Sequence, residues 1–236
     1  MSLVTASQCE SIGTYLALME EARARIEVIN QAYHNHERLA PRFVRESCYL
    51  QLRQLWEIVG LGCLVIHDGV TKTRRLMSAY EPMKMLAAMG ALKPHFYPQP
   101  ICVTREGPIH TFAAAQGAPH LSRAELRKLW TRSGDFLHRG SLSKLERPEA
   151  IVAALKPIDS SPTAFPDVFE WSAKVVGLLN NHWITLADNK RGIVVSLFSE
   201  NGQAKASLFD FNTANRAVIS VSVESFEFQK ASWLKG

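Results

Sequence analysis

The chain has 236 residues, of which 47% are hydrophobic and 21% charged, a composition typical of a globular protein with a sizeable core. Its net charge of +5 permits an anionic partner without requiring one. The longest uncharged apolar run, residues 58–66, is far shorter than the ~20 residues that span a bilayer. Residues 1–13 also lack the basic and apolar regions of a signal peptide. We therefore expect a soluble, cytoplasmic protein without a membrane partner.

The four cysteines are Cys9, Cys48, Cys63 and Cys102, and none has the spacing of a metal finger. Each lies among apolar neighbours, so we expect four buried thiols in a reducing compartment. His34, His36 and Glu37 are better interpreted as polar residues at a helix end than as metal ligands, because no second ligand cluster accompanies them. Phosphate-loop and dinucleotide-binding motifs are absent from the sequence. We predict no metal and no cofactor.

Helical patterns fill the first part of the chain. Residues 7–33 repeat apolar side chains every three or four positions, which predicts a long amphipathic helix. Pro41 fits the first turn of a second helix, which becomes almost wholly apolar after Trp56 and should lie centrally in a bundle. In that helix Gly60 and Gly62 either let a neighbour approach closely or mark the end.

Residues 73–92 return to helical spacing, and Pro82 either kinks this helix or starts a new one. Residues 93–100 contain three prolines and must run extended. Short β-rich runs at 101–103 and 109–112 predict a hairpin.

The last third of the chain changes character. We predict a minor helix at 148–156 and a longer one at 165–181. Alternating β-rich runs joined by turns then predict four strands, at residues 183–187, 193–198, 204–211 and 218–228. The predicted fold class is α+β, mainly α, with an antiparallel helical bundle over residues 1–160 that includes the hairpin near 101–112. Residues 161–236 would add a helix and a small antiparallel β meander packed on the bundle.

Residues 121–140 form the best-marked helix of the chain. Ser122 and Glu125 have the spacing of a capping box, and Gly140 can end the helix in the left-handed conformation. At about 100° per residue, one arc is suited to burial: Leu126, Leu129, Trp130, Ser133, Phe136 and Leu137. The remaining surface is basic. Residues 122–147 hold seven basic and three acidic residues, a local charge of +4.

Near the end of this helix, Arg132 is followed by five residues and then His138, and the chain continues with Arg139 and Gly140. This pattern resembles the HEPN superfamily of helical-bundle nucleases and nucleotide-associated proteins, whose hallmark is an arginine and a histidine near the end of a bundle helix. The resemblance implies metal-independent RNA cleavage. The histidine would manage the proton of a 2′-hydroxyl that attacks its neighbouring phosphate, and the arginine would neutralise the charge developing on the phosphoryl oxygens. It also implies a homodimer in which two copies of the motif face one cleft.

On an ideal helix, Arg132 and His138 are about 120° apart, so they converge only if the arginine wraps around the helix or the glycines loosen the backbone. Asp135 lies between them in angle and would either orient His138 or neutralise Arg132. The candidate catalytic residues are therefore Arg132, His138 and Asp135. The candidate nucleic-acid-binding residues are the cations that could hold an RNA backbone, namely Arg123, Arg127, Lys128, Arg139 and Lys144.

Two functional hypotheses remain. The first is a helical bundle of the toxin–antitoxin or phage-defence kind that binds or cleaves RNA, with a second copy of the chain as a partner. The alternative is a non-catalytic interaction module whose basic helix and C-terminal sheet bind an acidic or protein partner of unknown identity. A DNA-recognition helix is disfavoured because residues 113–119 are too short and broken to form the first helix of a helix-turn-helix.

Overall fold

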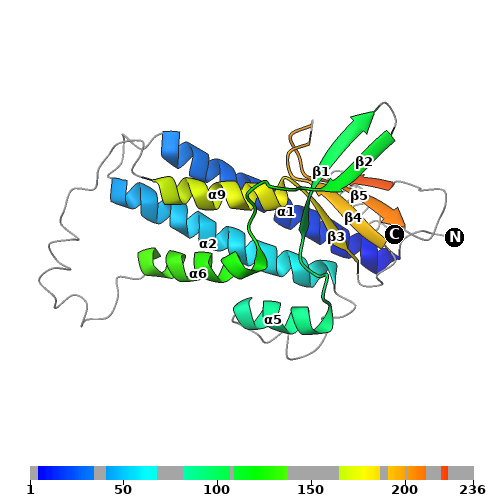
Figure 1. Ribbon diagram of the computed structural model, residues 1–236, viewed down its shortest axis with the longest axis horizontal. Coiled ribbons are helices and arrows are strands. Elements are labelled where there is room, and N and C mark those ends of the chain that lie inside the picture. Colours follow the sequence, from blue (N-terminus) through cyan, green and yellow to red (C-terminus); the bar gives the residue numbers. More distant parts are fainter. Residues whose placement is uncertain are drawn as a thin grey trace, which may run out of the picture.

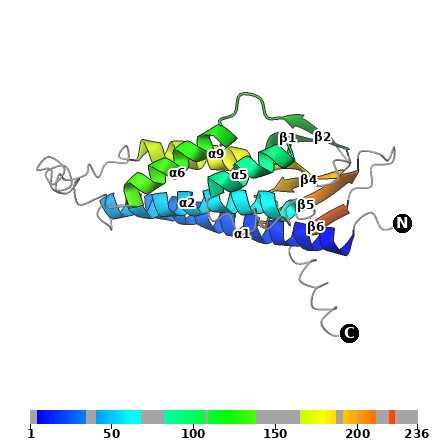
Figure 2. The ribbon, with the colours of Figure 1, turned by 90° about the horizontal axis from the view of Figure 1, so that it is seen from below.

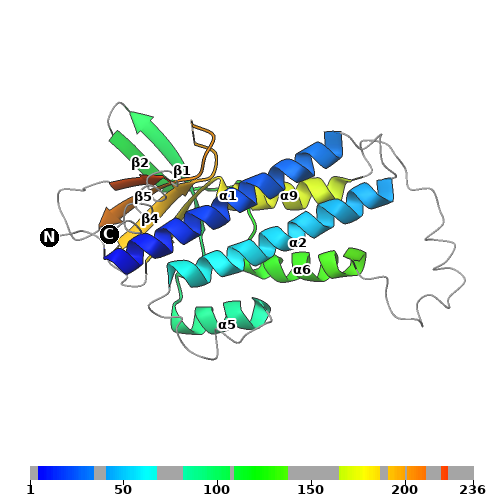
Figure 3. The ribbon, with the colours of Figure 1, turned by 180° about the vertical axis from the view of Figure 1, so that it is seen from behind.

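The computed structural model describes residues 5–34, 41–67, 82–106, 109–137, 165–186, 191–199, 201–210 and 219–222. Two long antiparallel helices, α1 (Ala6–His34) and α2 (Pro41–Ile66), run along the long axis of the molecule (Figure 1). Three shorter helices lie beside them: α5 (Pro82–Leu92), α6 (Arg123–Leu137) and α9 (Pro166–Leu179). Figures 2 and 3 show that α1 and α2 form one layer, with α5, α6 and α9 on the same side of it. The predicted class, α+β and mainly α, is confirmed.

The apolar periodicity of the first predicted helix marks the side of α1 that is buried. Its buried hydrophobic residues are Ile12, Tyr15, Leu16, Met19, Ala22, Ile26 and Ile29. The C-terminal half of α2 lies in the centre of the bundle, as its apolar sequence predicted, with Trp56, Val59 and Cys63 almost fully buried. Because the apolar faces of the two helices meet, their burial contributes much of the driving force for forming the bundle.

Two glycines allow other helices to approach α2 closely. A β-carbon added to Gly62 would lie 2.9 Å from the Tyr15 ring of α1, and one added to Gly60 would lie 3.0 Å from Cε of Met85 on α5. The helix continues beyond both glycines to Ile66. Of the two sequence-based interpretations, close approach is therefore confirmed and a helix end at Gly60 or Gly62 is wrong. The helix α5 begins at Pro82, whereas residues 73–81 and the minor helix predicted at 148–156 lie outside the described residues.

The strands form one antiparallel sheet in the order β2-β1-β3-β4-β5-β6. Their bounds are β1 (Gln99–Glu106), β2 (Ile109–Ala114), β3 (Asn181–Thr185), β4 (Arg191–Ser196), β5 (Lys205–Asp210) and β6 (Ile219–Ser222). The predicted hairpin and the predicted meander are both present. The sequence did not show that the hairpin and the meander form one sheet. They join where Gln99 pairs with Trp183 and Pro100 pairs with His182.

The hairpin of β1 and β2 folds across the outer face of the sheet. Along β3 and β4, residues that face the helices, such as Ile184 and Ile193, are fully buried. On the opposite face, the ring centroids of Phe112 on β2 and Phe209 on β5 lie 5.0 Å apart. Strands this far apart in the sheet order can touch only if the sheet curls strongly. Figure 1 accordingly shows β1 and β2 turned away from the direction of β3 and β4.

Two buried histidines tie the sheet to the bundle. His182 on β3 lies with Nε2 2.7 Å from the Tyr15 hydroxyl and Nδ1 3.0 Å from the Leu179 carbonyl oxygen. His67, just after α2, lies with Nδ1 2.7 Å from the Cys63 carbonyl oxygen and Nε2 2.8 Å from that of Thr185. Burial lowers the pKa of each imidazole to about 4. The His182 ring, whose partners are one carbonyl oxygen and one hydroxyl, is therefore neutral at physiological pH.

The expectation of four buried thiols is only half right. Cys48 and Cys63 are buried, but Cys9 is partly accessible and Cys102, on β1, is exposed. For Cys102 the apolar neighbours misled the prediction, because Val103 beside it is exposed as well. All four cysteines are free thiols. None of the described helices combines the length and the hydropathy that crossing a membrane requires.

Candidate nucleic-acid interface

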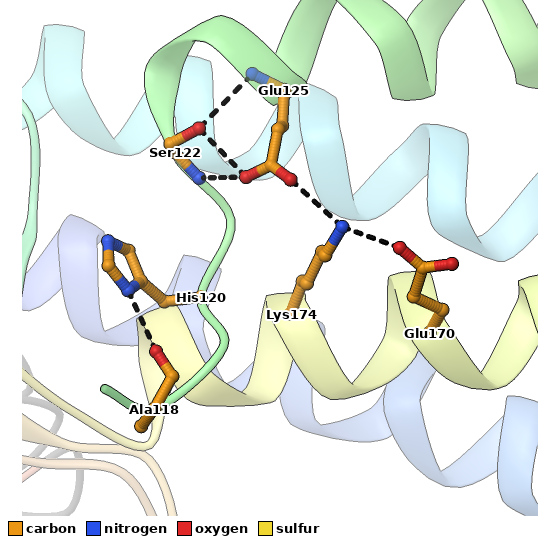
Figure 4. A network of polar contacts seen from close by, with 6 residues as sticks. All are labelled: Ala118, His120, Ser122, Glu125, Glu170 and Lys174. Atoms are coloured by element: carbon orange, nitrogen blue, oxygen red, sulfur yellow. Dashed lines mark hydrogen bonds and ion pairs between the residues drawn. The ribbon is translucent and has the colours of Figure 1, made fainter.

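The capping box predicted at the start of α6 is confirmed. The backbone N–H of Glu125 donates to Ser122 Oγ at 3.3 Å, and the backbone N–H of Ser122 donates to Glu125 Oε2 at 3.1 Å. The Ser122 hydroxyl also donates to the same carboxylate oxygen at 2.8 Å (Figure 4). These reciprocal bonds satisfy backbone groups that a helix start otherwise leaves without partners. They fix where α6 begins.

The start of α6 is also fastened to α9. Lys174 Nζ lies 2.9 Å from Glu125 Oε1 and 2.7 Å from Glu170 Oε1, and Figure 4 shows it between the two carboxylates. The hydrogen bond from Lys174, with those from Ser122, outweighs burial and lowers the pKa of Glu125 to about 2. In the opposite direction, the backbone N–H of Leu121 donates to the Lys174 carbonyl oxygen at 2.8 Å. The helix that carries the candidate site is thus held in a fixed position against α9.

The described side chains in the arc of α6 predicted to be buried are buried or partly buried. Leu126, Leu129 and Ser133 have no exposed surface, and the Ser133 hydroxyl donates to the Leu129 carbonyl oxygen at 2.8 Å. Trp130 and Leu137 are partly buried, and the Trp130 ring stacks 4.8 Å from Trp56 of α2. The side chain of Phe136 lies outside the described residues. The basic remainder of the helix surface therefore faces away from the core.

The predicted basic surface is divided between two sides of α6. Arg123 and Arg132 are about 180° apart on an ideal helix, and the two guanidinium groups turn to different neighbours. Arg123 extends towards α5, where its Cζ lies 5.4 Å from the centre of the Phe96 ring. Its guanidinium also occupies the space over Gly90, where an added β-carbon would lie 2.7 Å from Arg123 Nη1. This arginine is committed to packing at the α5 side.

Arg127 and Lys128 lie between these two sides. Both side chains are exposed, and within the described part of the chain neither takes part in an ion pair or a side-chain hydrogen bond. Exposed cations without carboxylate partners keep their full charge available to an anionic ligand. Lys128 is one helical turn before Arg132, so the two share one stretch of surface.

Arg132 turns towards α9, where it meets a cluster that the sequence did not predict. Its Nη2 lies 3.7 Å from Asp167 Oδ2. The same oxygen accepts a hydrogen bond from Arg45 Nη2 at 2.5 Å and one from the Tyr49 hydroxyl at 2.6 Å. We call these four residues, Arg45, Tyr49, Arg132 and Asp167, the Asp167 cluster. They come from α2, α6 and α9, whose neighbouring ends lie at the end of the bundle away from the sheet (Figure 1).

In the Asp167 cluster the shifts in pKa keep the Asp167 carboxyl group ionised and the Tyr49 phenol protonated. Burial raises the pKa of Asp167, but hydrogen bonds from Tyr49 and Arg45 and the charge of Arg45 outweigh it, so the net shift is downward. Burial and the hydrogen bond to Asp167 raise the pKa of Tyr49 to about 12, although a hydrogen bond from Arg132 opposes them. At neutral pH the cluster therefore contains two guanidinium cations, one carboxylate and a neutral phenol, a net charge of one positive unit.

The structure tests the remaining site predictions only in part. Asp135 belongs to α6, but its side chain is not among the described parts of the structure. His138, Arg139 and Lys144 lie wholly outside the described residues. The predicted convergence of Arg132 with His138 therefore stays a prediction. The carboxylate seen beside Arg132 is Asp167, and a pairing across so long a stretch of chain has no local sequence signal.

Among the described residues, no three histidine, cysteine, aspartate or glutamate side chains gather as metal ligands would.

Sequence and structure comparisons give no family to this chain. A scan against protein-family models and searches of curated proteins and of solved structures found no match.

Proposed function

We propose that this protein binds RNA along the outward-facing cations of α6, with Arg132 as a residue that contacts a phosphate. The observation that carries the proposal is the charge balance around Arg132. Its side chain is 48% exposed and its Nη2 lies 3.7 Å from Asp167 Oδ2, whereas Arg45 approaches the same oxygen to 2.5 Å. Within the Asp167 cluster two guanidinium groups face one carboxylate, so the cluster carries one positive charge more than it neutralises.

The exposed cations nearby extend this charge along the helix. Arg127 and Lys128 are exposed, and both lie within one to two helical turns of Arg132. Neighbouring phosphates of one nucleic-acid strand are suitable ligands for such a row, because each cation that contacts a phosphate releases condensed counterions. The spacing of Arg132 and His138 resembles that of the HEPN superfamily, and this resemblance supports RNA as the nucleic acid.

The same resemblance supports a catalytic step. His138 follows Leu137, the last residue of α6, and would accept the proton of a 2′-hydroxyl. The 2′-oxygen would attack the adjacent phosphorus and the bond to the 5′-oxygen would break. One product would carry a 2′,3′-cyclic phosphate, and the other would leave with a 5′-hydroxyl whose proton comes from water. Arg132 would stabilise the negative charge that develops on the phosphoryl oxygens. We propose this cleavage as metal-independent.

Binding can be tested by fluorescence anisotropy with a short labelled single-stranded RNA in buffer that contains EDTA. The wild-type protein is compared with Arg132→Gln and with Arg23→Gln. Arg23 is a suitable control because it is a similarly accessible arginine on α1 that pairs with Glu20 of its own helix at 2.9 Å. We expect Arg132→Gln to bind several-fold more weakly and Arg23→Gln to bind as the wild type does. Absence of wild-type binding, or equal behaviour of the two variants, would overturn the proposal.

Cleavage needs a separate test. The same RNA is incubated with the wild-type protein and with His138→Ala in EDTA, and the products are resolved by electrophoresis. We expect fragments from the wild type only, while His138→Ala still binds. RNA that stays intact with the wild-type protein would remove the catalytic step and leave the binding proposal to the anisotropy experiment.

A further inference from the structure

We infer that Asp167 competes with RNA phosphates for the Arg132 guanidinium. Through this competition Asp167 lowers the affinity of α6 for RNA. This inference rests on the proposed function and deepens it, because it assigns control of binding strength to a residue on a different helix. Neither the sequence pattern around Arg132 nor its exposed neighbours on α6 indicates such a residue.

The geometry shows which partner of this ion pair is anchored. Asp167 lies in the first turn of α9, is 22% exposed, and accepts hydrogen bonds from both Arg45 and Tyr49 of α2. Arg132 is 48% exposed and reaches the same oxygen only at 3.7 Å. Asp167 is therefore held by two hydrogen bonds from α2, and the longer and more exposed side chain of Arg132 is the one that can turn from the carboxylate to a phosphate.

The chemistry makes carboxylate and phosphate competitors. Both anions offer oxygen pairs to the fork of N–H donors on a guanidinium. The pKa of Asp167 lies below its ordinary value, so the carboxylate is ionised at neutral pH and can pair with the Arg132 guanidinium in place of a phosphate. Because the ion pair with Arg132 is long and partly solvated, it is weak. Asp167 should therefore reduce RNA affinity without abolishing it.

A double-mutant cycle with RNA tests the inference. Asp167→Asn, Arg132→Gln and the double variant are titrated with the same labelled RNA over a range of salt concentrations. We expect Asp167→Asn to bind about two- to fivefold more tightly, the range that a solvent-exposed ion pair implies. Its logarithmic salt dependence should steepen by about one phosphate contact. In the Arg132→Gln background, the change at Asp167 should have no effect.

Glu170→Gln is the matched control. Glu170 is on the same helix and its carboxylate pairs with Lys174 at 2.7 Å, so the variant loses one negative charge of α9 without touching the Asp167 cluster. We expect its RNA affinity to equal that of the wild type. An increase as large as that of Asp167→Asn would mean that only the net charge matters, and it would overturn the inference.

A second variant changes no charge. Tyr49→Phe removes the donor to Asp167 Oδ2 and the hydroxyl that Arg132 contacts. The carboxylate and the guanidinium each lose a partner, so they should pair more closely with each other and RNA should bind more weakly. This variant decides the question if Asp167→Asn fails to fold, as judged by circular dichroism. Unchanged or tighter binding by Tyr49→Phe would overturn the inference, as would unchanged or weaker binding by a folded Asp167→Asn. In both cases a weaker Arg132→Gln would leave the proposed function standing, whereas a wild type that does not bind would overturn both.

Discussion

The Tyr15 hydroxyl lies 2.7 Å from Nε2 of His182, in a contact that joins the first helix to the sheet inside the core. The other ring nitrogen, Nδ1, lies 3.0 Å from the Leu179 carbonyl oxygen. A carbonyl oxygen only accepts, so Nδ1 carries the proton and Nε2 accepts from the phenol. Both side chains are almost fully buried. This arrangement satisfies both nitrogens of the neutral imidazole, and a second proton would put a charge inside the core.

We predict that acid destabilises the fold before the carboxylates titrate. Burial lowers the pKa of His182 from 6.5 to about 4, and that of His67 likewise. Below pH 6.5 the unfolded chain binds protons that the folded chain does not, so the free energy of unfolding falls as the pH decreases towards 4. His182 contributes on the order of 3 kcal/mol to this loss. Urea denaturation at a series of pH values measures it.

His182→Gln should weaken this pH dependence, although it lowers stability at every pH. The exposed His95 provides the control, and His95→Gln should leave the profile unchanged. A free energy of unfolding that stays constant in the wild type between pH 6.5 and 4.5 would show that the buried imidazoles do not control acid stability.

We predict that Gly177→Ala destabilises the protein even though alanine favours helices by about 1 kcal/mol. A β-carbon at Gly177 of α9 would lie 2.1 Å from the Pro119 carbonyl oxygen. Backbone cannot rotate away as a side chain can, so we expect a net loss of about 1–3 kcal/mol. Gly60→Ala of α2 is the matched variant, because its β-carbon would meet only the flexible end of Met85, at 3.0 Å. Equal thermal stability of the two variants would contradict the close contact at Gly177.

We predict that thiol reagents distinguish the four cysteines in the native protein. Cys102 is exposed and should react first, followed by the partly accessible Cys9. Burial raises the pKa of Cys48 to about 11 and also raises that of Cys63, so both should react only after unfolding. The Cys102→Ser variant should lose the fastest phase of labelling, measured by mass spectrometry. A fast phase that survives this substitution would place the reactive thiol elsewhere.

The sequence predicted features that depend on neighbouring residues. The spacing of Ser122 and Glu125 predicted a capping box because the bonds form within one helical turn. The alternation along residues 183–187 predicted β3, whose residues are alternately buried and half-buried, because half of a strand's side chains face the core. Similarly, the three-and-four spacing of residues 7–33 predicted α1 almost to its ends.

Features that depend on distant residues could not be predicted in this way. The pairing of Gln99 with Trp183 joins the hairpin to the meander, but no pattern within either strand indicates which edge it will meet. The approach of Arg132 to Asp167 likewise depends on how α6 and α9 pack. Helical angles alone predict that Arg123 and Arg132 lie on opposite sides of α6. Only the packing shows that the Arg123 guanidinium contacts α5 and that the Arg132 guanidinium approaches α9.

The most direct measurement of the central claim is the salt dependence of RNA affinity for the wild type and for the double variant Arg127→Gln/Lys128→Gln. Both cations are exposed, so the substitutions should leave thermal stability unchanged. We predict that the wild-type dissociation constant rises steeply with salt and that the double variant loses about two phosphate contacts from the logarithmic slope. A slope identical to that of the wild type would contradict RNA binding along α6.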